Sequence, residues 1–169
     1  MSGVTAVLGF AAVSMLAWIY FTYAASATER GLQRLKLRGS IRAIRDTVMY
    51  LPFLLVAGVT LFAAGLGTAV AEAGHHLPPG AAVCLSAGIS LFFAANTAES
   101  LRYGASRRGI AMWAVPGIVL PWVLVPLAAE APAELVVAAS VGVIAIVLAL
   151  TAISARRIRS TDALIEETT

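Results

Sequence analysis

Cysteine and charge are both scarce in this sequence of 169 residues. The single cysteine, Cys84, excludes a disulfide within the chain and a metal site built from several thiolates. Charged residues make up 12% of the chain, about half of what a soluble domain carries. The sequence also lacks a Ser–His–Asp set, a phosphate-binding glycine loop and a Walker sequence. These absences argue against a soluble enzyme of a familiar class.

Hydrophobic residues, in contrast, make up 60% of the chain, and the mean hydropathy is +0.88. A membrane-spanning helix needs about 20 apolar residues, and five runs meet that length. They are residues 4–27, 47–71, 81–101, 110–129 and 134–155. Because backbone groups must pair with one another in lipid, each run is predicted to be helical. The predicted fold is therefore all-α, with residues 1–169 forming one five-helix transmembrane domain and residues 156–169 its tail.

The twelve Lys and Arg residues fall in three clusters, at residues 30–45, 102–108 and 156–159. The short connections at 72–80 and 130–133 contain none. Because positive charge near a span resists translocation, this alternation predicts an outside N-terminus and a cytoplasmic C-terminus. The basic residues flank spans instead of forming a folded basic module. We therefore expect a multi-pass protein of the cell membrane, with membrane lipid as a partner and no nucleic acid.

Prolines and serines within the runs give two further expectations. Three prolines stand five residues apart in the fourth run: Pro116, Pro121 and Pro126. Each removes an amide donor and disrupts the preceding turn, so this helix is predicted to be bent or locally open. The serines Ser86, Ser90 and Ser140 are expected to bond to the backbone of their own helices.

A series of short motifs carries a family resemblance. In order, they are Trp18-Ile19-Tyr20-Phe21, Tyr50-Leu51-Pro52, Ala57-Gly58, Ala63-Ala64-Gly65-Leu66, Pro78-Pro79 and Ala87-Gly88-Ile89-Ser90-Leu91-Phe92. Over about residues 15–105 the chain resembles the later, C-terminal half of the bacterial low temperature requirement A (LtrA) membrane proteins. It departs from that pattern at Thr22, where the family usually has an acidic residue. The resemblance implies a bacterial multi-pass membrane protein and no defined activity, and its half-length match suggests a homodimer.

Carboxylates near one end of the spans are the candidate catalytic groups, because ionisable residues within a membrane are costly and are often functional. Glu99 shares a helix face with Asn96 and Tyr103, which lie three residues before it and four after it. Glu29 and Asp46 are expected at the same membrane depth. Since a buried carboxylic acid can donate a proton, Glu99 is predicted as a general acid tuned by Asp46 or Glu29. The alternative is an interfacial ion pair of each acid with an arginine nearby in sequence.

Aromatic and polar residues around these acids are the predicted lining of a substrate site. They are Trp18, Tyr20, Tyr23, Tyr50, Phe92, Asn96, Tyr103 and Trp122. Aromatic faces can stabilise a cation, which would suit protonation of an isoprenoid-type alkene or epoxide. The alternative for the Trp and Tyr residues is an ordinary interfacial belt.

Three functions remain open from the sequence. The first is a membrane-embedded enzyme acting on a lipid-soluble substrate, such as a terpene cyclase or isomerase. The second is a non-enzymatic LtrA-like component with a role in assembly, lipid binding or stress. The third is a transporter, which five spans fit poorly because they cannot form two equal halves. We expect no cofactor, and no metal site, since His75 and His76 are adjacent and lack the spacing of one.

Overall fold

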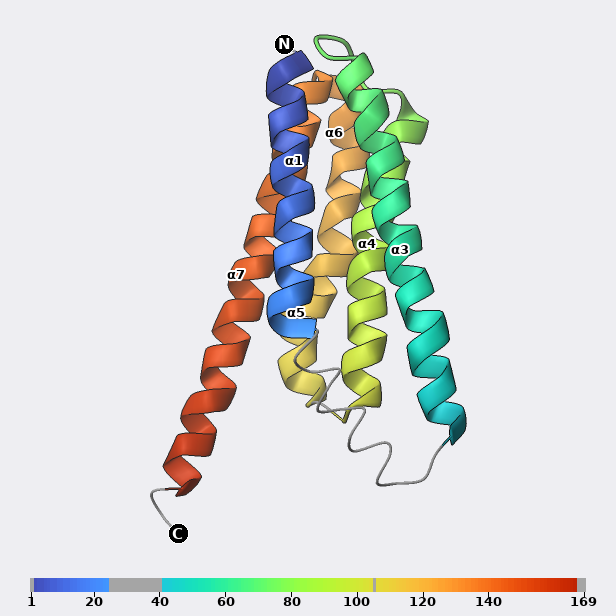
Figure 1. Ribbon diagram of the computed structural model, residues 1–169. Coiled ribbons are helices and arrows are strands. Elements are labelled where there is room, and N and C mark those ends of the chain that lie inside the picture. The colour runs from blue at the N-terminus through green and yellow to red at the C-terminus, as the bar shows by residue number, and fades with distance from the viewer. Residues whose placement is uncertain (1, 25–40, 105, 167–169) are drawn as a thin grey trace.

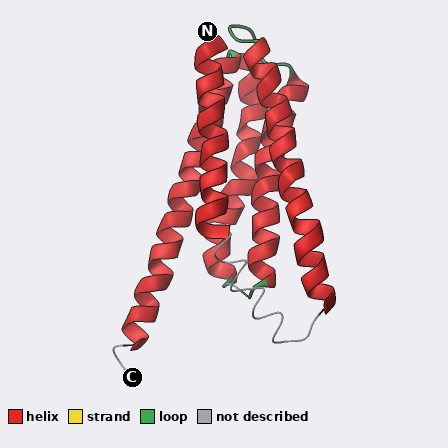
Figure 2. Ribbon diagram, in the orientation of Figure 1, coloured by secondary structure: helices red, strands yellow, loops and turns green. Residues whose placement is uncertain are grey.

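The computed structural model is helical over almost all of the residues that it describes (Figure 2). It describes residues 2–24, 41–104 and 106–166, and the side chains of residues 3–22, 50–104 and 106–154. Within those ranges there is no strand, and the one isolated β-bridge joins His76 and Pro132. The all-α prediction is therefore confirmed for the described part of the chain.

The elements follow one another through short connections. In chain order they are α1 (Ser2–Ile19), the π-helical turn η1 (Tyr20–Ala24), α3 (Ile41–Ala71), α4 (Pro79–Arg102), α5 (Arg107–Val119), the 3₁₀ turn η2 (Leu120–Val123), α6 (Leu124–Glu130) and α7 (Ala133–Glu166). Five helical segments are long and apolar enough to cross a membrane: Gly3–Thr22, Tyr50–Ala71, Pro79–Arg102, Arg107–Glu130 and Ala133–Ser154. The prediction of five spanning helices is thus confirmed.

The five segments run side by side along one axis, and α7 tilts away from the others toward its C-terminal end (Figure 1). The α4–α5 connection, with the exposed side chains of Arg102, Arg107 and Arg108, lies at one end of the bundle, which we call the basic end. The opposite end carries the α3–α4 and α6–α7 connections, and we call it the histidine end because His75 and His76 lie there. The assignment of the basic end to the cytoplasm stays a prediction from charge.

Glycines bring α3 and α4 close together. A Cβ atom at Gly88 of α4 would lie 2.5 Å from the amide nitrogen of Phe62 and 2.8 Å from the carbonyl oxygen of Gly58. A Cβ atom at Gly65 would lie 2.7 Å from the carbonyl oxygen of Ala81. Small residues allow such close backbone approach in membranes, where hydrophobicity does not drive helices together. The absence of side chains at these glycines is therefore what sets the spacing of α3 and α4.

Hydroxyl groups join α4 to the fourth span at the point where that span breaks. The Ser90 hydroxyl donates to the carbonyl oxygen of Ile118 at 2.7 Å, and the Ser86 hydroxyl lies 2.9 Å from the carbonyl oxygen of Pro121. The predicted distortion of this span is confirmed, because the α-helix gives way to 3₁₀ geometry at residues 120–123. Pro121 has no amide hydrogen, so it cannot donate to the Ile118 carbonyl three residues earlier. Ser90 supplies a donor there instead.

The serine predictions have mixed outcomes. Ser140 donates to the carbonyl oxygen of Val137 in its own helix, as expected. Ser86 lies within hydrogen-bond distance of Ala82 in its own helix as well as of Pro121. For Ser90 the prediction is wrong, because its hydroxyl bonds across to the neighbouring helix. The carbonyl groups near the proline break provide these additional acceptors.

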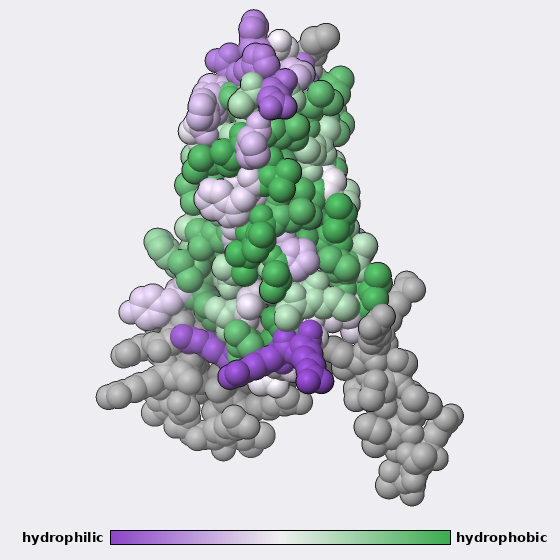
Figure 3. All heavy atoms as spheres, turned by 180° about the vertical axis from the view of Figure 1, so that it is seen from behind, coloured by the Kyte–Doolittle hydropathy of each residue, from purple (hydrophilic) through white to green (hydrophobic). Residues whose placement is uncertain are grey.

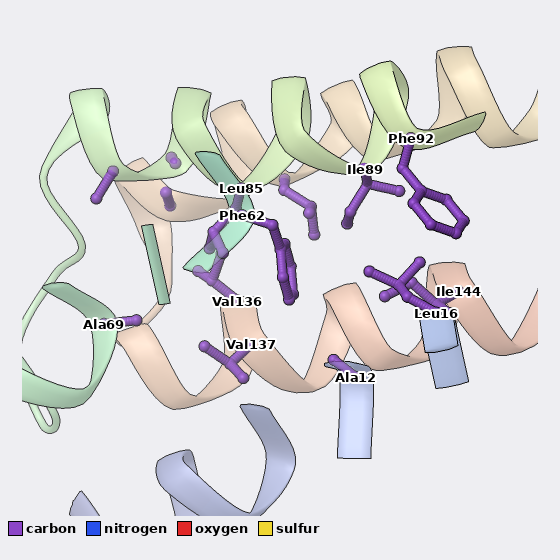
Figure 4. Packing of buried hydrophobic residues seen from close by; sticks show 14 of the residues in the cluster. Ala12, Leu16, Phe62, Ala69, Leu85, Ile89, Phe92, Val136, Val137 and Ile144 are labelled. Carbon is purple, nitrogen blue, oxygen red and sulfur yellow. The ribbon is translucent and has the colours of Figure 1, made fainter. Parts of the chain in front are cut away.

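The apolar core lies where α1, α3, α4 and α7 meet (Figure 4). Its labelled members are Ala12, Leu16, Phe62, Ala69, Leu85, Ile89, Phe92, Val136, Val137 and Ile144. At the histidine end the two connections also meet, since the amide of Ala133 donates to the carbonyl oxygen of His75 at 2.9 Å. The bundle is thus packed along its centre and joined through backbone at that end.

Candidate functional site

Glu99 is buried near the basic end of α4, with 8% of its surface exposed. The Tyr103 hydroxyl donates to its Oε1 atom at 3.0 Å, and the Tyr103 amide donates to its carbonyl oxygen at 3.1 Å. Both contacts follow from the four-residue spacing, because Tyr103 is the residue directly after α4 and caps its C-terminal end. The structure therefore brings together two of the residues that the sequence singled out.

Asn96 shares this helix and is also buried, with 6% of its surface exposed. Its Nδ2 atom donates to the carbonyl oxygen of Phe92 at 2.9 Å, and the neighbouring Thr97 hydroxyl donates to that of Phe93 at 2.7 Å. Each of the two groups thus donates a hydrogen bond within α4. They allow polar side chains to lie inside an apolar bundle at low cost.

The other two candidate acids are not placed beside Glu99. Glu29 lies outside the described residues, and Asp46 lies in the N-terminal part of α3 with its side chain outside them. The convergence of three carboxylates therefore stays a prediction. Among the described residues, no group of three His, Cys, Asp or Glu side chains is arranged to hold a metal ion.

The predicted aromatic lining divides into exposed and groove-lining residues. Trp18, Tyr50 and Trp122 expose 64%, 63% and 48% of their surfaces. In a membrane such side chains contact lipid. Tyr20 and Phe92, in contrast, line a groove inside the bundle. The side chain of Tyr23 lies outside the described part.

This groove, which we call the α1–α3 groove, has a volume of about 340 Å³. Its lining comes from α1 and η1 (Val13, Leu16, Ala17 and Tyr20), from α3 (Pro52, Leu55, Val56, Val59 and Thr60) and from Phe92 of α4. The size falls within the range of about 300–1,000 Å³ that is typical of small-molecule pockets. All of these residues lie in the half of the bundle nearest the basic end.

The groove is chemically apolar. Two of its ten lining residues carry a hydroxyl, and that of Thr60 donates to the carbonyl oxygen of Val56 at 2.8 Å. Glu99 does not line it. From Phe92 to Glu99 the helix advances seven residues, or about 10 Å. The predicted role of Glu99 as a general acid stays a prediction, because the acid and the groove lie at different levels along α4.

Sequence reasoning missed most of the groove. Residues such as Val13, Leu55 and Val59 are ordinary apolar side chains within apolar runs, and nothing distinguishes them from residues that face lipid. The one usable signal was Pro52, which lies inside α3 and lacks an amide donor. Proline in a spanning helix is common enough that it would not have located the groove by itself.

Comparison with known proteins extends the resemblance noted in the sequence. The chain matches the family described as bacterial low temperature requirement A protein (LtrA) over residues 2–155, well beyond residues 15–105. Comparison with the curated proteins and with the solved structures gives no match. The family match and the five apolar spanning helices agree with each other. The chain therefore belongs to the bacterial low temperature requirement A (LtrA) family and is a multi-pass membrane protein.

Proposed function

We propose that this protein is a non-enzymatic membrane component that holds the apolar chain of a lipid in the α1–α3 groove. The observation that carries the proposal is the groove itself, which is about 340 Å³ in volume and almost entirely apolar. Membership of the LtrA family supports a role in the membrane, and the description of the family names no chemical reaction.

The position of the groove favours a lipid as its occupant. Its lining residues all lie within or beside three spanning segments, so at this depth the surroundings are hydrocarbon and not water. Leu16, Leu55 and Phe92 form its buried part, and the more exposed Val56 lies at its rim. A flexible hydrocarbon chain matches such a surface because binding leaves no polar group unpaired.

An acid-catalysed enzyme, such as a cyclase or isomerase for isoprenoid-type substrates, is the second candidate. It is favoured by the burial of Glu99 and the hydrogen bond from Tyr103. The lipid-binding proposal is preferred because the acid and the groove are separated along α4. The two proposals make opposite predictions for Glu99→Gln.

Photo-crosslinking tests the lipid-binding proposal. Membranes carrying a phospholipid with a photoreactive group in its acyl chain would be irradiated, and the labelled peptides would be identified by mass spectrometry. We expect label on α1 and α3 at groove residues. Val56→Trp should lower it by about tenfold, which corresponds to about 1.4 kcal/mol of binding, because the indole would fill the groove.

The matched control is Ile146→Trp, which places the same side chain on α7 at a position with 52% exposure outside the groove lining. It should leave the labelling unchanged. Equal labelling of the two variants would contradict the proposal. The Glu99→Gln variant supplies a second test. If it has the unfolding temperature of the unaltered protein but changes the lipid products of the cells, the lipid-binding proposal is contradicted, because that result is expected of the enzyme.

A further inference from the structure

A second groove lies on the opposite side of α4, between α4 and α5, and we call it the α4–α5 groove. Its volume is about 570 Å³. It is lined by Thr97, Leu101 and Gly104 from the end of α4 and its turn, and by Arg107, Ile110, Ala111, Ala114, Val115 and Ile118 from α5. It shares no lining residue with the α1–α3 groove.

The charge in this groove is confined to one end. Arg107 is the first residue of α5 and is exposed at the basic end, and it makes no ion pair with a described residue. Arg102 and Arg108 are exposed on either side of it. Figure 3, which views the molecule from behind, shows hydrophilic side chains gathered below a broad apolar surface at this end. The Arg107 guanidinium can therefore contact an anion that approaches the mouth of the groove.

The remainder of the groove is apolar and runs into the membrane. The lining residues of α5 recur at intervals of three and one, which places them on one face of the helix. From Arg107 to Ile118 the helix rises about 16 Å, close to half of the hydrocarbon thickness of about 30 Å. The Thr97 hydroxyl donates to Phe93 in its own helix. The groove thus offers one cationic group at the surface and an apolar path through one leaflet.

The mouth of the groove is open and has two further features that suit a phosphate. Gly104 adopts a φ of +78°, and no atom lies within 4 Å of where its Cβ would be. The first amides of α5 are also at the mouth, and helix N-termini attract phosphate groups. These features add to the charge of Arg107 and would not indicate a site without it.

We propose that the α4–α5 groove binds an anionic phospholipid, with the headgroup phosphate on Arg107 and one acyl chain along α5 toward Ile118. Basic pockets between spanning helices are suited to anionic headgroups. A soluble phosphate would occupy only the mouth and leave the apolar face unfilled. The proposal does not depend on the α1–α3 groove, because it uses a different side of α4, other residues and a charged headgroup.

Native mass spectrometry of the purified protein tests this proposal. Phosphatidylglycerol and phosphatidylcholine with identical acyl chains would be titrated separately, with inorganic phosphate as a third arm. We expect phosphatidylglycerol to bind about fivefold more tightly than phosphatidylcholine, the gain that one arginine contributes near an anionic surface. Arg107→Gln should remove this preference, whereas Arg108→Gln, one residue on and outside the groove, should retain it.

A second variant tests the apolar part. Ala111→Phe narrows the groove without changing charge, and it should weaken phosphatidylglycerol binding while the unfolding temperature of the lipid-free protein stays the same. Val56→Trp, which fills the α1–α3 groove, should leave phosphatidylglycerol binding intact. A failure of the α1–α3 proposal can therefore be told apart from a failure of this one. Equal binding of the two lipids, equal losses in the two arginine variants, or displacement of the lipid by an equal concentration of inorganic phosphate would each overturn the proposal.

Discussion

The two sides of α4 hold their neighbours in different ways. Toward α3 the contacting residues are Ala81, Leu85, Gly88 and Phe92, and toward the fourth span they are Ser86, Ser90, Phe93 and Thr97. Both sets are spaced four, three and four residues apart, so they form two parallel stripes on one helix. The first stripe relies on close backbone approach at glycine. The second includes hydroxyl bonds to carbonyl groups at a helix break.

This difference shows how one helix can occupy the centre of a membrane bundle. A glycine contact tolerates no added atom, because the obstacle is backbone that cannot move aside. A hydroxyl contact depends on a single hydrogen bond, which is worth little in a membrane when the donor can find another partner. The α3 side should therefore be far more sensitive to substitution than the side that faces the fourth span.

Gly88→Ala should have the largest effect. The added Cβ would lie 2.5 Å from the Phe62 nitrogen and would force α3 and α4 apart. We expect a loss of about 3 kcal/mol, the upper part of the usual range for overpacking, measured as reversible unfolding in detergent. The control is Gly67→Ala in α3, where nothing lies within 4 Å of the new atom. Similar stability of the two variants would refute the role assigned to the glycine contact.

Ser90→Ala should have an intermediate effect, because it removes the 2.7 Å bond to Ile118. A loss of about 1 kcal/mol is expected, within the range measured for hydrogen bonds between membrane helices. Ser140→Ala is the control, since this buried hydroxyl bonds to Val137 in its own helix. It should cost less than Ser90→Ala under the same unfolding assay. A larger loss at Ser140 would show that the bond between helices is unimportant.

Val83→Leu should have the smallest effect. Val83 lies on α4 outside both stripes and exposes 40% of its surface. An added methylene there should extend into lipid, so stability should change by no more than about 0.5 kcal/mol. The unfolding temperature is again the measurement. A loss comparable to that of Gly88→Ala would mean that the side of α4 carrying Val83 also packs against protein.

The number of helices could be predicted from sequence because lipid leaves the backbone no alternative to internal pairing. The break in the fourth span followed from Pro121, which cannot donate a hydrogen bond. Hydropathy could not show which side of α4 meets protein. Val83 and Leu85 are both strongly apolar, yet Val83 is partly exposed and Leu85 is fully buried. Lipid and the protein interior are alike in polarity, so the sequence carries little information about which side of a helix faces lipid and which faces protein.

The candidate site was predictable to the extent that it is local. Glu99 and Tyr103 meet because they lie four residues apart on one helix. The α1–α3 groove joins residues from four elements, α1, η1, α3 and α4, and its existence depends on how α1 and α3 separate. The bond from Ser90 to Ile118 likewise required knowledge of which helix lies beside α4. Such relations become visible only once the helices are placed in space.

The backbone bond from Ala133 to His75 has a consequence for how this protein can vary. Neither imidazole takes part in it, so the bond itself does not require the side chains of His75 and His76, whereas Gly74 in the same turn has a φ of 92° that favours glycine. It depends instead on the number of residues between Ala71 and Pro79, because one more or one fewer would carry the carbonyl oxygen out of range. At that end of the molecule, the length of the turn and the glycine at position 74 are the requirements, and the two histidine side chains are not.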